Sequence, residues 1–124
     1  MVEMTGHDLV DAWLPTLLAP SASETSRDWA ATLLRHTRTS AAPTYARALA
    51  VDLRAVLPTI DVPTLVVHGT DDARASRRVA DELVSLVVDA ELSVIDGAGH
   101  LVNVDAPEQF ATQVRSFLTR KYDS

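Results

Sequence analysis

The chain has 124 residues, 47% hydrophobic and 23% charged, a composition typical of one globular domain that excludes disordered, collagen-like and coiled-coil proteins. It contains no cysteine, which excludes disulfides, a thiol nucleophile and cysteine-ligated metal sites. The net charge is −6 and the basic residues are scattered along the chain, so we expect no nucleic-acid partner.

Residues 1–57 show helical periodicity or turn composition. We expect a first helix at about residues 7–18, ending near Pro15 or Pro20. A second helix should follow the sequence SASE at residues 21–24, which fits a capping box. A third should begin at Pro43. The apolar face of the second helix is expected to hold Trp29, Leu33 and Leu34, and that of the third Tyr45, Leu49, Leu53 and Val56.

The pattern changes at residue 62, where VPTLVVHG predicts a buried strand at residues 63–68. The turn GTDDARAS leads to a helix at about residues 76–88, and ELSVID predicts a second strand at residues 91–96. The apolar face of that helix is expected to consist of Val79, Leu83, Leu86 and Val87.

A last helix follows the loop GAGHLVNVDAPEQ. In it we expect Asp105 as the N-cap, Pro107 in the first turn and Glu108 as the capping-box partner. Its buried stripe should be Phe110, Val114, Phe117 and Leu118.

Strand, helix, strand, helix with short connections predicts a βαβα unit with parallel strands. Two parallel strands alone leave unpaired edges and uncovered faces. We therefore expect these residues to be one end of a larger α/β sheet.

Both loops that follow the strands carry polar side chains where ligands bind in open α/β sheets. Asp71 and Asp72 follow the first strand, and Gly97, Gly99 and His100 follow the second. Adjacent parallel strands lie ~5 Å apart, so a carboxylate and an imidazole here can form a hydrogen bond. This pair is the acid and base half of a nucleophile, histidine and carboxylate triad.

Simpler interpretations exist for each residue. Asp72 precedes a helix and fits a capping carboxylate, and a single loop histidine such as His100 often bonds only a backbone carbonyl. A metal site made of His68, Asp71, Asp72 and His100 has acceptable ligand types but no spaced ligand motif. His68 is interpreted as a structural residue of the strand. We favour the triad interpretation because both residues follow strand ends.

The aromatic residues Trp13, Trp29 and Tyr45 could line a substrate cleft, although such residues are more often packing. Arg77 and Arg78 begin a helix and are expected to face solvent.

The sequence VPTLVVHGTDD, followed by ELSVIDGAGHLVNVDAPEQF and an amphipathic helix, resembles the C-terminal end of the α/β-hydrolase fold over roughly residues 52–119. The resemblance implies that Asp72 is the catalytic acid and His100 the catalytic histidine. The segment that leads into the first strand, PTYARALAVDLRAVLPTIDVPTLVV, is similar to the corresponding segment of enol-lactone hydrolases and related esterases, where cap helices precede the strand.

The resemblance thus implies an α/β fold class, with residues 1–57 as a cap-like helical segment and residues 58–124 as the C-terminal βαβα portion of the core. It implies hydrolysis of a small-molecule ester or lactone, with no metal and no cofactor. The nucleophile motif G-x-S-x-G is not present in these 124 residues. We expect the nucleophile-bearing N-terminal half to be absent and the chain alone to be inactive.

An alternative from a different class is a non-catalytic, truncated interaction module that binds a partner along its exposed sheet edge. For the hydrolase, we expect self-association or pairing with the missing half. No apolar stretch approaches the ~20 residues of a membrane span, and residues 9–22 lack the preceding basic residue of a signal peptide. We expect a cytoplasmic protein without a membrane partner.

Overall fold

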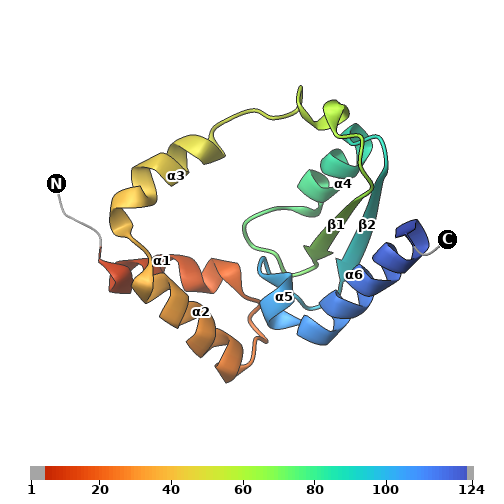
Figure 1. Cartoon of the computed structure of the whole chain (residues 1–124). Coiled ribbons are helices and arrows are strands. Elements are labelled where there is room, and N and C mark those ends of the chain that lie inside the picture. Colours follow the sequence, from red (N-terminus) through yellow and green to blue (C-terminus); the bar gives the residue numbers. More distant parts are fainter. Residues whose placement is uncertain (1–4, 123–124) are drawn as a thin grey trace.

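The computed structural model describes residues 5–122, with the backbone alone at residues 41 and 42. Three helices precede the first strand, and they lie to one side of the sheet and its helices (Figure 1). The elements in chain order are α1 (Gly6–Leu17), α2 (Glu24–His36), η1 (Thr39–Ala41), α3 (Ala42–Leu49), η2 (Leu57–Thr59), β1 (Thr64–Gly69), α4 (Arg77–Leu86), β2 (Ala90–Ile95), α5 (Val102–Asp105) and α6 (Pro107–Tyr122).

Strands β1 and β2 pair in parallel, from Thr64 opposite Ala90 to Gly69 opposite Ile95. Both α4 and α6 contact the two strands, and they lie on opposite faces of the sheet (Figure 1). The predicted βαβα unit and the α/β fold class are therefore confirmed, with strand boundaries shifted by one residue. Within residues 5–122 the sheet has these two strands, so each has one unpaired edge.

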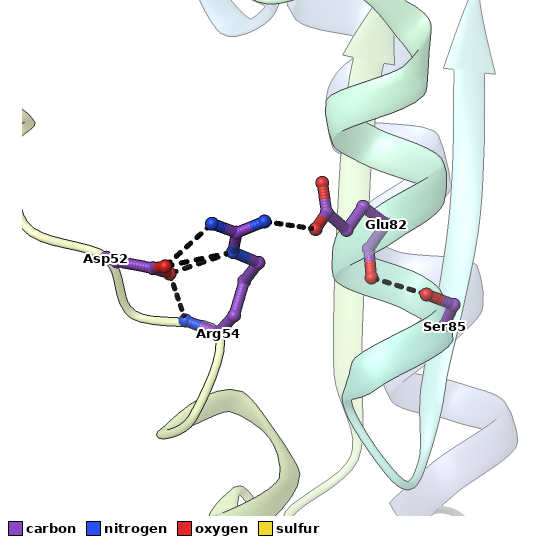
Figure 2. A network of polar contacts seen from close by, with 4 residues as sticks. All are labelled: Asp52, Arg54, Glu82 and Ser85. Atoms are coloured by element: carbon purple, nitrogen blue, oxygen red, sulfur yellow. Dashed lines mark hydrogen bonds and ion pairs between the residues drawn. The ribbon is translucent and has the colours of Figure 1, made fainter.

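The segment that precedes β1 is tied to α4 by an exposed polar network. Figure 2 shows Arg54 between Asp52 and Glu82, with nitrogen to oxygen distances of 2.7 Å and 3.8 Å. Ser85 Oγ donates to the carbonyl oxygen of Glu82, one turn earlier on α4. The hydrogen bonds from Arg54 lower the pKa of Asp52 to about 2. Because these side chains are exposed to solvent, the network orients the segment and adds little stability.

The buried side chains form two clusters. The first joins α1 to α2 and the second joins β2 to α5. The first consists of Leu9, Leu17, Leu18, Ala30 and Leu34. The second consists of Ile95, Ala98 and Val102. Leu101 and Val104 pack against the first cluster, so the region that contains α5 connects the N-terminal helices to the sheet. Figure 1 shows α5 beside the end of α1.

The first helix is confirmed: α1 continues through Pro15 and ends at Leu17, and its capping box is formed by Thr5 and Asp8. Helix α2 corrects two expectations. Helix α2 is capped by Ser23, which accepts from the N–H of Ser26, so the SASE capping box was wrong. Trp29 and Leu33 are each half exposed. The buried residues of α2 are Ala30, Ala31 and Leu34, because α1 packs against a face rotated from the expected one.

The long amphipathic stripe expected from residue 45 to residue 56 was also wrong. Helix α3 ends at Leu49, and Leu49, Leu53 and Val56 are more than half exposed. The carboxylate of Asp52 accepts the backbone N–H of Arg54 at 3.0 Å. Such a local turn competes with helical hydrogen bonding and ends the helical segment.

Asp105 is not the N-cap of the last helix. It is the last residue of the short helix α5, and its carboxylate accepts hydrogen bonds from distant backbone groups. In α6 Phe117 is buried as predicted, whereas Leu118 is 47% exposed. In α4 the buried residue is Ala80, whereas Val79 is 44% exposed.

The chain exposes 8498 Å². A compact monomer of this mass is expected to expose about 6,500 Å². Much of the excess is apolar, since many large hydrophobic side chains are exposed on residues 49–62. The described helices include none that is long and apolar enough to span a membrane.

Candidate active site

The site is built where the two strands end. Gly69 of β1 pairs with Ile95 of β2, so the loops that follow begin side by side. Thr70 Oγ1 accepts the N–H of Gly97 at 2.8 Å, and the N–H of Asp71 donates to the carbonyl oxygen of Ala98 at 2.9 Å. The two loops are therefore fixed to each other by direct hydrogen bonds.

Two glycines make this close approach feasible. A Cβ atom on Gly69 would overlap the backbone carbonyl of Ala98 in the other loop. Gly97 has φ +72°, a left-handed conformation that side-chain-bearing residues rarely adopt. The flanking glycines thus let the backbone of the second loop turn and pass directly over the end of β1.

The structure brings Asp72 and His100 together. Asp72 Oδ2 lies 3.0 Å from His100 Nδ1, and the other oxygen, Oδ1, accepts the N–H groups of Arg74 at 2.8 Å and Ala75 at 2.9 Å. The N-cap of α4 is Ser76, so Asp72 is not the helix cap of the simpler interpretation. One carboxylate oxygen is held by the turn and the other faces the imidazole.

The environment of Asp72 favours its ionised form. Burial, which leaves 6% of the side chain exposed, raises the pKa, but the hydrogen bonds from Ala75, His100 and Arg74 outweigh it and hold the pKa of Asp72 below its ordinary value. An ionised carboxylate can only accept hydrogen bonds. His100 Nδ1 must therefore carry the proton, which leaves Nε2 with a free lone pair. The His100 side chain is 37% exposed.

Two further residues of the considered metal site lie differently. His68 is buried, and its Nδ1 is 3.9 Å from Asp72 Oδ2, beyond hydrogen-bond distance. Asp71 is exposed on the loop. Within residues 5–122 no group of three or more His, Asp or Glu side chains is arranged to hold a metal ion.

Asp105 is a site residue whose role the sequence analysis missed. Its Oδ2 accepts the N–H of Gly99 at 2.8 Å and the N–H of Ala19 at 2.7 Å. A Cβ atom on Gly99 would overlap the backbone of Leu18 and Ala19. The N–H of Leu101 also donates to the carbonyl oxygen of Leu17 at 2.8 Å. The loop that carries His100 is thus anchored on both sides of the histidine to the end of α1.

An apolar cleft of about 330 Å³ is lined by α1, α2, η1, α3 and one residue from each of the two loops, and neither Asp72 nor His100 is among its lining residues. It reaches Arg74, two residues after Asp72, and Leu101, next to His100. Trp13 and Tyr45 line it with ring centroids 5.6 Å apart, and the Arg74 guanidinium lies 5.1 Å from the centre of the Trp13 ring. Trp29, the third aromatic residue considered, is not among the lining residues.

A sequence model described as alpha/beta hydrolase family matches residues 3–113. The chain is 39% identical over 104 residues to polyketide synthase ThaQ of Burkholderia thailandensis, which covers 81% of this chain and 5% of that protein. It is 39% identical over 64 residues to 2-hydroxy-6-oxo-6-(2'-aminophenyl)hexa-2,4-dienoic acid hydrolase of Metapseudomonas resinovorans, covering 52% of this chain and 22% of that protein.

Solved structures show the same fold. The esterase EaEST from Exiguobacterium antarcticum superposes with a TM-score of 0.79 at 25% identity, over 89% of this chain and 41% of that chain. A thermophilic esterase from Thermogutta terrifontis gives a TM-score of 0.81 at 22% identity, over 91% of this chain and 43% of that chain. This chain therefore spans less than half the length of these relatives.

Proposed function

Because the chain belongs to the alpha/beta hydrolase family, we propose that Asp72 and His100 are the acid and the base of a serine-type site that hydrolyses a carboxylic ester or lactone. The observation that carries this proposal is the 3.0 Å contact between Asp72 Oδ2 and His100 Nδ1, with the other carboxylate oxygen held by backbone N–H groups. The esterase names of the structural relatives support the choice of bond.

In this mechanism His100 Nε2 takes the proton from a serine hydroxyl as the oxygen attacks the ester carbonyl. When the tetrahedral intermediate collapses, the same nitrogen gives the proton to the leaving oxygen. Asp72 stays ionised throughout, keeps the proton on Nδ1 and stabilises the imidazolium. A water molecule then attacks the acyl-serine by the same route, with His100 again as the base.

The serine and the N–H groups that stabilise the oxyanion must come from polypeptide outside these 124 residues. The chain has four glycines, Gly6, Gly69, Gly97 and Gly99, and none of them forms a G-x-S-x-G turn. The isolated chain therefore supplies general-base assistance alone, worth about 10²- to 10⁴-fold.

The unpaired edge of β1 is the place where the nucleophile-bearing part would join. In the described part of the chain β1 pairs with β2 on one edge and has no neighbour on the other. Pairing there would extend the parallel sheet and would cover exposed apolar surface. The same edge would serve the alternative, a non-catalytic module that binds a partner strand.

The proposal is tested by fusing this chain to the portion of the Exiguobacterium antarcticum esterase that it does not match. We expect the fusion to hydrolyse p-nitrophenyl acetate, and His100→Ala or Asp72→Ala to lower turnover by about 10³-fold or more. Asp71→Asn, at the exposed neighbouring carboxylate, should leave turnover unchanged.

Full activity in the His100→Ala fusion would contradict the proposed role. A fusion that is folded and monomeric but hydrolyses no ester would favour the non-catalytic module. The isolated chain, measured beside the fusion, should show no turnover at enzyme rates.

A further inference from the structure

The cleft lined by Arg74 and Leu101 combines apolar side chains with two basic ones. The interior is made by side chains that include Leu9, Trp13, Leu17, Leu34 and Leu101. Its charged lining residues are Arg38 and Arg74, and no carboxylate of residues 5–122 lines it. This distribution is unexpected in a chain of net charge −6.

Arg74 is held in place by aromatic side chains. Its guanidinium carbon lies 5.1 Å from the centre of the Trp13 ring, within the range of a cation–π contact, and Trp13 in turn packs against Tyr45. A guanidinium that stacks by its face keeps the N–H groups of its edge available for a planar anion. Arg74 is exposed to solvent, and its contact with Trp13 orients the guanidinium toward the cleft lining.

The charges of Arg74 and Arg38 are not neutralised by the protein. No ion pair among residues 5–122 involves either side chain. Among residues 5–122, Arg54, Arg77 and Arg120 lie within 4 Å of a carboxylate, and the other arginines resemble Arg74 and Arg38 in forming no ion pair. What distinguishes Arg74 and Arg38 is that both line the apolar cleft. Two guanidinium groups in the lining of one cleft attract an anion and repel a cation.

We propose that the cleft binds the apolar part of a substrate that also carries a carboxylate, and that Arg74, with Arg38, binds this carboxylate. The assignment rests on the proposed function, because the loops that carry Asp72 and His100 each contribute a lining residue to the cleft, Arg74 and Leu101. The volume of 330 Å³ is at the lower end of ligand pockets, about 300 to 1,000 Å³. The substrate class is therefore a compact carboxylate-bearing ester or lactone with a short acyl chain or a single ring.

Binding to the isolated chain tests this without any need for turnover. Trp29 is half exposed and lies outside the cleft, so a Trp29→Phe background leaves Trp13 as the fluorescent reporter. The probes are 4-phenylbutyrate and its neutral isostere 4-phenylbutyramide. At low salt we expect 4-phenylbutyrate to bind about tenfold more tightly than 4-phenylbutyramide, because one charge-assisted hydrogen bond contributes about that difference in affinity.

Variants locate the effect. Arg74→Gln should remove most of the preference for the carboxylate, Arg74→Lys should retain part of it, and Arg78→Gln, an equal charge change on the exposed face of α4, should retain all of it. Equal affinities for the two probes, an absence of saturable quenching by either, or a preference that survives Arg74→Gln combined with Arg38→Gln would overturn the proposal. Tighter binding of the matching phosphonate would overturn the assignment to a carboxylate.

The failure of this inference can be told from the failure of the proposed function. A carboxylate preference in an inactive fusion would support the proposed carboxylate site and contradict the proposed hydrolase function. A fusion that hydrolyses anionic and neutral esters equally well would keep the hydrolase and reject the anion site.

Discussion

Asp105 holds Gly99, the residue before His100, through a 2.8 Å hydrogen bond from the Gly99 N–H to its carboxylate oxygen Oδ2. The same oxygen accepts the N–H of Ala19 at 2.7 Å, and the other oxygen is buried without a partner among residues 5–122. A single carboxylate therefore joins the loop that carries His100 to the end of α1 and fixes the backbone directly before His100.

Replacing Asp105 by alanine should destabilise the chain by about 2 to 4 kcal/mol, because two partly buried N–H groups lose their acceptor. Asp105→Asn should cost less, since the amide oxygen can still accept both. The measurement is the free energy of unfolding in urea. Asp61→Ala, at an exposed carboxylate, should change it by less than about 0.5 kcal/mol. An equally small effect of Asp105→Ala would contradict the anchoring role.

Gly99→Ala and Gly97→Ala form a matched pair. A Cβ atom at Gly99 meets the backbone of Leu18 and Ala19, so we expect a loss of about 3 kcal/mol. At Gly97 there is open space, and the cost is that of a left-handed conformation, about 1 kcal/mol. Unfolding in urea compares the two variants. A larger loss at Gly97 than at Gly99 would show that the loop does not press against the end of α1.

The lowered pKa of Asp72 predicts a pH dependence of stability. In the unfolded chain the carboxyl titrates near its ordinary value of 3.8, and in the folded chain it titrates below that value. Its contribution is therefore complete well above pH 3.8 and is lost as the pH falls through the folded value. The stability difference between wild type and Asp72→Asn should therefore shrink as the pH falls from about 5 to below 3.8.

Urea unfolding across this pH range measures the difference, with Asp61→Asn as the control for loss of one exposed carboxylate. A difference that grows between about pH 5 and pH 3, where the Asp72 carboxylate takes up its proton, would have the wrong sign for a depressed pKa.

The exposed apolar surface predicts self-association of the isolated chain. Leu49, Leu53 and Val56 are each more than half exposed, and the total exposed area exceeds that of a compact monomer by about 30%. Size-exclusion chromatography with light scattering should give a mass above 13.4 kDa at micromolar concentration. Replacing these three residues by glutamine should lower that mass. A wild-type monomer with a cooperative melt would contradict this expectation.

The features that follow local rules could be predicted from the sequence. Strands β1 and β2 show as β-branched runs, and the meeting of Asp72 with His100 follows because parallel strands end at one edge of a sheet. The role of Asp105 could not be predicted, since its partner Ala19 lies 86 residues away and no local pattern marks the pair. The faces of α2 and α3 were assigned wrongly because periodicity shows that a face is apolar, not which neighbour covers it.

The most direct test of the central claim is the tautomer of His100, read from two-bond ¹H–¹⁵N correlations in the wild-type chain and in Asp72→Asn. The account predicts a proton on Nδ1 and an unprotonated Nε2 in the neutral wild-type imidazole, and a loss of this tautomer in Asp72→Asn. A neutral His100 with its proton on Nε2, or a spectrum unchanged by Asp72→Asn, would contradict the assignment of Asp72 and His100 as acid and base of one site.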